Sequence, residues 1–241
     1  MSNILVIDIG NTSTSVGLYR SGRVQRVRRM DSRGVTRLAA LALGREVVDG
    51  IPLHGAMVAS VVPAATGRWQ QVGRALAGRC GVVSHRTPLG TPISYPRPAT
   101  IGPDRLANAC GGVRKYGAPL IVADFGTAVT FDCISRTRGY IGGVIAPGLP
   151  LMFSYLAEKT ALLPHIGVGA TRSRVGRNTA EAMRLGARWG YRDHRRTAAQ
   201  PGVERRAAGG HRRLRRMGGA GTPPPHGCRS EPDPVWSRPC L

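Results

Sequence analysis

Short apolar runs, each bounded by turn-forming residues, divide most of the chain into strands and helices. The run at residues 3–9 is typical of a buried strand. The pattern after it predicts further strands at residues 14–19, 23–29, 56–62 and 82–83 and helices at residues 35–43, 69–77 and 104–116. The prolines between residues 88 and 98 predict an extended loop between these elements.

The opening pattern then returns. Apolar segments predict strands at residues 120–124, 128–134 and 140–145 and helices at residues 149–159 and 178–190. Asp8-Ile9-Gly10-Asn11-Thr12 and Asp124-Phe125-Gly126-Thr127 each follow a buried strand, 116 residues apart (124 − 8). Because an internal repeat constrains the whole fold, we predict a duplicated α/β architecture, with one half at residues 1–117 and the other at 118–191.

Charge is distributed unevenly along the chain. The 241 residues carry 35 Lys and Arg against 13 Asp and Glu, a net charge of +22. Residues 192–241 hold 11 arginines, seven prolines and seven glycines but only four of Ile, Leu and Val. Such a segment buries too little apolar surface to offset its ordering entropy, so we expect a disordered basic tail there. Only Lys115 and Lys159 are lysines, a bias that fits a GC-rich genome better than a phosphate-binding surface.

Composition also excludes several classes of protein. Hydrophobic residues at 41% are enough for a core. No apolar run approaches the roughly 18 residues of a membrane span, and no signal-like segment opens the chain. The five cysteines are scattered without zinc-binding spacing, which fits a reduced chain. We therefore expect a cytoplasmic protein with no membrane partner and no structural zinc.

The repeated Asp-x-Gly motif suits phosphate chemistry. A strand delivers the carboxylate to its end, where it can face a cation, while the glycine permits a turn whose backbone N–H groups and Thr hydroxyl can face a phosphate. A single copy is also what an ordinary hairpin turn favours. Two copies, each behind a buried strand, favour a clamp around a polyphosphate instead.

Further motifs follow in a fixed order, and together they resemble one family. They are Asp8-Ile9-Gly10-Asn11-Thr12, Gly102-Pro103-Asp104-Arg105, Asp124-Phe125-Gly126-Thr127-Ala128, Gly142-Gly143-Val144-Ile145-Ala146-Pro147-Gly148, Thr160-Ala161-Leu162-Leu163-Pro164 and Gly176-Arg177-Asn178-Thr179. Over residues 3–191 they look like type III pantothenate kinase, the family that includes the Bvg accessory factors. The resemblance implies an acetate/sugar kinase–Hsp70–actin-like fold with ATP between its halves. It also implies a homodimer that phosphorylates pantothenate in the first step of coenzyme A synthesis.

The resemblance also implies site residues. ATP contacts are implied for Asp8, Ile9, Gly10, Asn11, Thr12, Ser13, Thr14, Ser15 and Thr127. Pantothenate contacts are implied for Tyr95, Gly102, Pro103, Asp104, Arg105 and Thr179, with Asp104 as the proton acceptor. Asp124 matches the ligand of a monovalent cation, K⁺ or NH₄⁺, and Asp8 would hold the Mg²⁺ of Mg·ATP through water. Four of the nine acidic residues before residue 192 lie in or beside these motifs, namely Asp8, Asp104, Asp124 and Asp132.

The chemistry of the residues agrees with these roles. A carboxylate with a pKa of about 3.9 cannot ionise an alcohol beforehand, so Asp104 would orient the hydroxyl and take its proton late. Arg105 is a permanent cation that can pair with the carboxylate of pantothenate. The structural alternatives are a helix start for Asp104 and Thr179 and an ordinary surface position for Arg105.

The resemblance fades after Tyr191. Family members continue with a long helix, a strand leading to a Thr-Gly-Gly loop near the adenosine, and apolar helices, whereas Gly209-Gly210 has neither a Thr nor a buried strand before it. The composition after residue 191 is what out-of-frame reading of GC-rich DNA gives, so we hypothesise a frameshift near residue 192. We expect an incomplete second half, a weakened dimer contact, impaired activity, and exposure of Met183, Leu185 and Trp189. Sequencing the DNA tests this, because an alternate frame must then encode an apolar continuation with a Gly-Gly loop.

Three other functions compete with this one. A weak or inactive regulator like the Bvg accessory factors is the main alternative, and the retained Asp8, Asp104, Arg105 and Asp124 favour the kinase. An arginine-rich nucleic-acid binder is poorly supported, because the chain has no recognised module or aromatic platform. A related sugar or acetate kinase is disfavoured by the motif at residues 102–105. We therefore expect ATP and pantothenate as partners and no specific nucleic acid.

Overall fold

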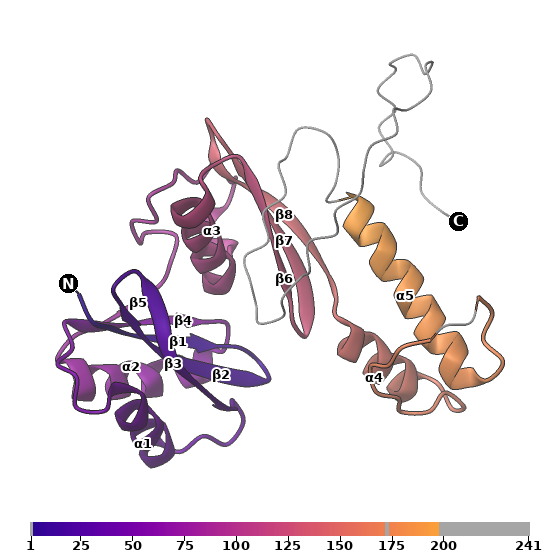
Figure 1. Cartoon of the computed structure of the whole chain (residues 1–241), viewed down its shortest axis with the longest axis horizontal. Coiled ribbons are helices and arrows are strands. Elements are labelled where there is room, and N and C mark those ends of the chain that lie inside the picture. Colours follow the sequence, from indigo (N-terminus) through magenta and orange to yellow (C-terminus); the bar gives the residue numbers. More distant parts are fainter. Residues whose placement is uncertain (1, 172–173, 198–241) are drawn as a thin grey trace. The chain divides into compact units, whose positions relative to one another are not determined.

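The computed structural model describes residues 2–171 and 174–197, and for residues 191–197 it describes the backbone alone. All these residues fall within a single structural unit. They form two sheets with helices packed against them (Figure 1). Most of the expected basic tail, from residue 198 onward, lies outside the described residues.

The first sheet has five strands in the order β3-β2-β1-β4-β5. They are β1 (Ile4–Ile9), β2 (Ser13–Arg20), β3 (Arg23–Asp31), β4 (Gly55–Ser60) and β5 (Cys80–Val82). Strand β1 pairs antiparallel with β2 and parallel with β4. Asp8 lies near the end of β1, opposite Ser15 of β2 and Ala59 of β4, so the sheet carries this carboxylate to its edge.

Helices α1 (Arg37–Val48) and α2 (Pro63–Ala77) cover one face of this sheet (Figure 1). Leu5, Ile7 and Ile9 alternate along β1, and they pack with Val47 and Trp69 in one buried cluster. The Thr36 side chain caps α1 by accepting from the backbone N–H of Ala39 at 3.1 Å. Pro63 occupies the first turn of α2, where its missing N–H is not needed. The opposite face of the sheet, which carries Asp8, is therefore left to α3 and the site.

The second sheet follows helix α3 and has the order β6-β7-β8 within the described residues. The elements are the 3₁₀ turn η1 (Pro98–Thr100), α3 (Pro103–Tyr116), β6 (Leu120–Phe125), β7 (Ala128–Ser135), β8 (Gly139–Pro147), α4 (Leu149–Lys159) and α5 (Thr179–Thr197). Leu106 of α3 is buried in one cluster with Ala59 of β4 and Val122 of β6. Helix α3 therefore contributes to the packing of both sheets, and its N-terminus carries Asp104 and Arg105.

Most of the predicted elements are present, and three helices show the largest differences in extent. Helix α1 runs on to Val48 instead of ending at residue 43, because Gly44 and Val47 are buried on its inner face. Helix α2 begins at Pro63, six positions before the predicted start at residue 69 (69 − 63), since a proline that ends a strand also suits a helix start. Helix α5 continues to Thr197, into the segment expected to be disordered.

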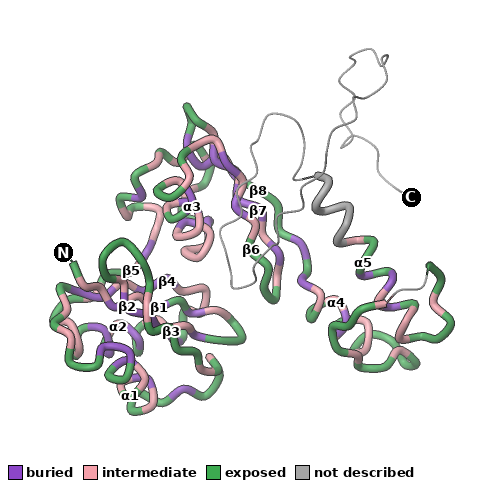
Figure 2. The backbone as a smooth tube through the Cα atoms, viewed as in Figure 1, coloured by how far each residue is buried: buried purple, intermediate pink, exposed green. Residues whose placement is uncertain are grey.

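Of the three α5 side chains expected to be exposed, Met183, Leu185 and Trp189, only Trp189 is exposed. Met183 is 7% exposed and packs with Phe153 of α4, and Leu185 is also buried. Trp189, in contrast, is 55% exposed. Burial also differs between parts of the chain (Figure 2). Buried positions are spread through the first sheet and its helices, whereas the segment between α4 and α5 is mostly exposed.

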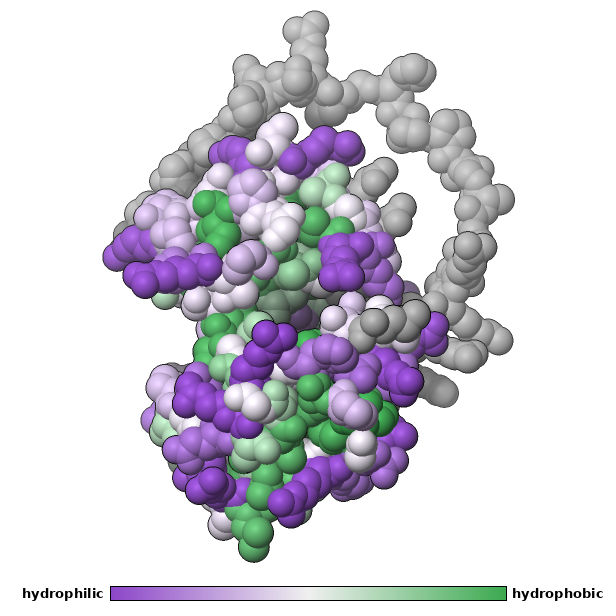
Figure 3. Space-filling view, turned by 90° about the vertical axis from the view of Figure 1, so that its left-hand side faces the viewer, coloured by the Kyte–Doolittle hydropathy of each residue, from purple (hydrophilic) through white to green (hydrophobic). Residues whose placement is uncertain are grey.

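The surface carries the charge in separate groups. On the face seen in Figure 3, hydrophilic residues gather in several clusters with neutral and apolar residues between them. On β3, Arg26 pairs with Asp49 and Arg28 pairs with Glu46, so part of the basic charge is neutralised locally. No helix in the described part of the chain is long and apolar enough to cross a membrane.

Candidate active site

The two repeated motifs form two similar turns that meet. After β1, the backbone N–H of Gly10 donates to the carbonyl of Ser13 at 3.1 Å, and after β6 that of Gly126 donates to the carbonyl of Ala128 at 2.9 Å. The hydroxyl oxygens of Thr12 and Thr127 lie 3.1 Å apart and share a hydrogen bond. Residues 115 positions apart in the sequence thus form one hydroxyl-lined junction between the two loops.

Gly148, just before α4, packs closely against the loop that contains Gly126 and Thr127. Its backbone N–H donates to the Thr127 carbonyl at 2.8 Å. A Cβ atom at this position would lie 2.2 Å from the carbonyl oxygen of Gly126 and 2.4 Å from that of Thr127. Only glycine therefore lets the start of α4 approach the Thr127 loop this closely.

Three carboxylates gather beside this junction. Desolvation raises the pKa of Asp8 above its usual 3.8, and the neighbouring charges of Asp104 and Asp124 raise it further, while Arg29 lowers it. Asp124 accepts a hydrogen bond from Nδ2 of Asn108 at 3.0 Å. Asn108 lies one helical turn after Asp104 on α3, so one helix face holds both Asp104 and the partner of Asp124. Nothing in the sequence pattern singled out Asn108.

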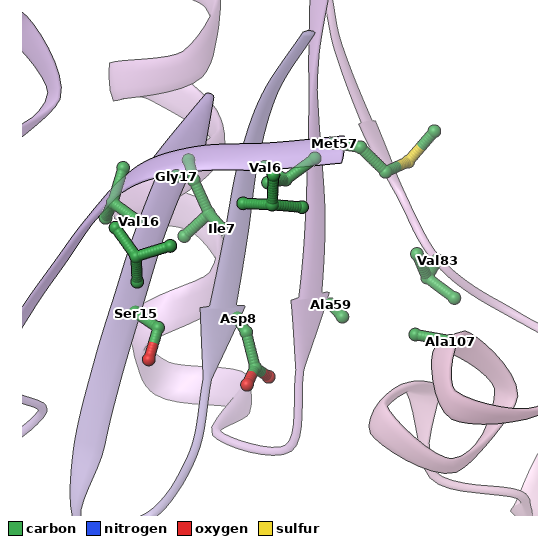
Figure 4. Close-up of a pocket in the computed structure, with 12 residues that line it drawn as sticks. Val6, Ile7, Asp8, Ser15, Val16, Gly17, Met57, Ala59, Val83 and Ala107 are labelled. Carbon is green, nitrogen blue, oxygen red and sulfur yellow. The ribbon is translucent and has the colours of Figure 1, made fainter. Parts of the chain in front are cut away.

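A cavity of about 300 Å³ opens next to Asp8. Figure 4 shows Asp8 and Ser15 side by side at one end of it, on neighbouring strands. The remaining walls are largely apolar and come from four strands, the segment after β5, and α3; they include Val6, Gly17, Val27, Met57, Val83 and Ala107. Among the residues that line this cavity, the one carboxylate is that of Asp8, which is predicted to hold Mg²⁺ through water.

The carboxylates fit a cation that the substrate helps to hold. Within residues 2–171 and 174–197, no group of three or more His, Cys, Asp and Glu side chains is arranged to hold a metal alone. Mg²⁺ in kinase sites commonly takes one or two carboxylates together with substrate phosphates. Burial and then repulsion from the neighbouring carboxylates raise the pKa of Asp8, and a bound cation would relieve that repulsion.

A second cluster surrounds Arg105. Its Nε donates to Oδ1 of Asp132 at 2.7 Å, and the hydroxyl of Tyr140 donates to the same oxygen at 3.0 Å. The Tyr95 ring packs edge-on against Tyr140, with the ring centroids 6.1 Å apart. Two predicted pantothenate contacts, Tyr95 and Arg105, therefore converge on Asp132 and Tyr140. Asp132 lies beside the motifs in the sequence, but its spacing gave no sign of its partner.

Other predicted site residues are arranged differently. Ile9 is 1% exposed and Thr14 is fully buried, bonded to the Ser32 hydroxyl at 2.8 Å. Any contact of these two with ATP would have to come from the backbone. Gly102 precedes Pro103 at the start of α3. Thr179 begins α5, and the hydrogen bonds among the described residues do not join it to Asp104 or Arg105.

Comparison with known proteins decides the family. A family model described as type III pantothenate kinase matches residues 4–198. The chain belongs to the type III pantothenate kinase family. This confirms the resemblance inferred from the motifs and extends it from residue 191 to residue 198.

Curated members of the family are similar over much of the chain. The type III pantothenate kinase of Methylacidiphilum infernorum is 36% identical over 189 residues, covering 78% of this chain and 67% of that protein. The Akkermansia muciniphila enzyme of the same name is 46% identical over 147 residues, covering 61% of this chain and 60% of that protein. The chain thus spans about two thirds of the length of these relatives.

A solved structure supports the fold. A Campylobacter jejuni protein described as a Baf family transcriptional activator superposes with a TM-score of 0.53 at 17% identity, covering 83% of this chain and 80% of that one. At this identity the likeness concerns the fold alone. Together with the family match, it confirms the predicted α/β, actin-like kinase fold.

Proposed function

We propose that the chain transfers the γ-phosphoryl group of ATP to the terminal hydroxyl of pantothenate, the first step of coenzyme A synthesis. The observation that carries this proposal is the Thr12–Thr127 hydrogen bond, which joins both phosphate loops beside Asp8, Asp104 and Asp124. Phosphoryl transfer depends mainly on positioning and charge neutralisation, and this junction offers donors for phosphate and carboxylates for cations.

The two loops would hold the nucleotide. Backbone N–H groups in the turn between β1 and β2 and the hydroxyls of Ser13, Ser15, Thr12 and Thr127 would donate to phosphate oxygens. Mg²⁺, when bound, neutralises charge on the phosphates, and Asp8 would hold it through water. Asp124, oriented by Asn108, would take a monovalent cation, K⁺ or NH₄⁺.

Asp104 would act on the pantothenate hydroxyl. Its Oδ1 already accepts from the backbone N–H of Arg105 at 2.8 Å, which fixes the carboxylate at the start of α3. As the bond from the γ-phosphorus to its bridging oxygen breaks and the bond to the pantothenate oxygen forms, the hydroxyl proton passes to Asp104. A late transfer suits a carboxylate, because the hydroxyl becomes acidic only as attack proceeds.

The rest of pantothenate would lie along the motif that begins α3. Arg105 would bind its carboxylate, and Tyr95, Gly102 and Pro103 would line the pocket. Thr179 would complete the pocket from α5.

We also propose that two copies of the chain form a homodimer in the cytoplasm. Each copy would consist of two halves, residues 1–117 and residues 118–191. Light scattering, which measures the mass of the protein in solution, would test whether the dimer forms.

The test is ADP release that depends on both ATP and pantothenate. Asp104→Asn should lower kcat by about 10²–10⁴-fold, the usual contribution of a positioned acid or base. The matched control is Asp49→Asn, because Asp49 is an exposed acid paired with Arg26 and should leave the rate unchanged. Pantothenate binding without turnover in the starting protein would instead support a regulator like the Bvg accessory factors.

The monovalent cation is tested in the same assay. Replacing K⁺ with Na⁺ should lower the rate of the starting protein, because Na⁺ is smaller and holds its water more tightly. Asp124→Asn should remove the difference between the two salts. Equal rates in both salts before any substitution would contradict the proposed site.

A further inference from the structure

We propose that Asp132 and Tyr140 are positioning residues that hold the Arg105 guanidinium ready for the carboxylate of the substrate. The inference rests on the proposed function and adds two residues to it. Neither residue would touch the reacting atoms, since both would act through Arg105.

The geometry places the pair behind Arg105. Asp132 is fully buried and Arg105 is 12% exposed, so their 2.7 Å ion pair is nearly shielded from water. The Tyr140 hydroxyl donates to the same Asp132 oxygen, and the Arg105 guanidinium carbon lies 5.8 Å from the centre of the Tyr140 ring. Because both donors meet the same carboxylate oxygen, the Tyr140 hydroxyl holds in place the oxygen to which Arg105 Nε donates.

The sheet explains why these residues meet. Asp132 lies in the middle of β7, paired with Val122 of β6 and Gly143 of β8. A Cβ on Gly143 would lie 2.7 Å from Nη2 of Arg105 and 1.9 Å from the carbonyl oxygen of Phe131. The glycine therefore leaves the space that the guanidinium occupies. This gives a local reason for the Gly142-Gly143 motif.

The protein provides hydrogen-bond acceptors for only some of the N–H groups of the Arg105 guanidinium. Nη2 of Arg105 is buried and has no hydrogen-bond partner among the described residues. A buried donor without a partner is costly, and a carboxylate is the ligand that a guanidinium edge binds best. Asp132 neutralises the cation so that the side chain can stay nearly buried, and its remaining 12% exposure leaves part of Arg105 within reach of a ligand.

Tyr95 extends the same cluster toward the substrate. Its ring meets Tyr140 at an interplanar angle of 69°, and a Cβ on Gly142 would lie 3.3 Å from the Tyr95 ring. The two aromatic rings would thus transmit a change at Tyr140 to a second predicted pantothenate contact. A single buried unit would then align both contacts.

Calorimetry on the full chain tests the inference with two ligands. They are pantothenate and pantothenol, in which a hydroxymethyl group replaces the carboxylate. Asp132→Asn should lower the affinity for pantothenate by about tenfold, as for loss of a hydrogen bond to a charged group, and change that for pantothenol little. In an Arg105→Lys background, Asp132→Asn should have no further effect. Cys133→Ala, on the opposite face of the same strand, is the control and should change neither affinity.

The outcomes separate the two proposals. If the starting protein binds no pantothenate, the proposed function fails and this inference fails with it. If the starting protein binds pantothenate and Asp132→Asn binds it equally well, or loses both ligands equally, only the inference is overturned. Should Asp132→Asn not fold, as judged by thermal unfolding, Tyr140→Phe decides, because it removes only the hydroxyl; the expected result is again a loss selective for pantothenate.

Discussion

Asp8, Asp104 and Asp124 place like charges together at the junction of the two phosphate loops, and each is held there by a different element. Burial raises the pKa of Asp8, and the charges of Asp104 and Asp124 raise it further, which means that the folded state disfavours the ionised form of Asp8. An arrangement that costs stability in the free protein is useful when cations and phosphates are to be bound. The ionised carboxylate of Asp8 therefore lowers the stability of the free protein while serving the proposed binding of cations and phosphates.

Asp8→Asn should therefore stabilise the protein while removing nucleotide binding. The folded pKa of Asp8 is raised, so its protonated form contributes stability at low pH that is lost as pH rises through the folded pKa. At pH 7 the ionised carboxylate destabilises the fold, and the neutral amide does not. We expect a higher Tm in calorimetry at pH 7 and no detectable Mg·ATP binding. A lower Tm would show that the carboxylate stabilises the fold.

Nucleotide binding should also depend on pH in a defined direction. Because its pKa is raised, Asp8 takes up a proton at a higher pH than an ordinary aspartate, and Mg·ATP affinity should fall there. Asp104→Asn removes the repelling charge with the larger effect, leaving Asp124 and the opposing Arg29, so the midpoint should move to lower pH. Titration calorimetry across the acid range measures both midpoints, and an unchanged midpoint would exclude the coupling.

The candidate site is formed by elements that are far apart in the sequence but pack closely against one another. The Thr127 loop rests on the start of α4 at Gly148, and α3 packs against both sheets while carrying Asp104, Arg105 and Asn108. Small shifts of these elements should therefore affect nucleotide binding more than overall stability.

Gly148→Ala tests the contact between α4 and the Thr127 loop. A methyl group there collides with two carbonyl oxygens, so the loop must move, and ATP affinity should fall by about tenfold or more. The matched control is Gly111→Ala on the exposed side of α3, where nothing lies within 4 Å. That change should raise stability by about 0.5–1 kcal/mol and leave ATP affinity alone. Equal ATP affinity in the two variants would contradict the role of Gly148.

Much of the fold could be predicted from local pattern. Helix α4 has the predicted limits, because its apolar spacing and flanking Gly148 are local signals. The end of α1 could not be predicted, since Gly44 normally weakens a helix and is tolerated here because it is buried. The extension of α5 was missed because its last residues are strongly basic and resemble the tail in composition.

The site was predictable only where its residues belong to a short continuous motif. The two Asp-x-Gly turns and residues 102–105 could be read from order and spacing. Asn108, Asp132 and Tyr140 could not, because their partners lie 16, 27 and 8 residues away. The first two contacts form only when α3 packs on the second sheet, and the third forms only when β7 pairs with β8. A sequence pattern describes one element, whereas these contacts depend on how two elements pack.

At the scale of the whole molecule, the net charge of +22 is the most conspicuous property. The face seen in Figure 3 carries its hydrophilic residues in separate clusters, and two surface arginines, Arg26 and Arg28, pair with acids. The proposed polyanion is small, namely ATP, and in the proposed site it would bind where the carboxylates would hold cations. Charge alone should produce weak binding to long polyanions without selectivity.

DNA binding should therefore be salt-sensitive and indifferent to sequence. Duplexes of different sequence should be retained equally at about 50 mM salt and released by about 200 mM, because only counterion release drives the binding. Mobility shifts with two unrelated duplexes measure this. A shift that persists at the higher salt for one sequence would reveal a specific partner instead.

The most direct test of the account is the chemical fate of pantothenate. The full chain should be incubated with pantothenate, ATP, Mg²⁺ and K⁺, and the products identified by mass spectrometry. The account predicts a phosphate monoester of pantothenate and an equal amount of ADP, both lost in Asp104→Asn and retained in Asp49→Asn. Unmodified pantothenate after prolonged incubation, with binding of both substrates established by calorimetry, would contradict it.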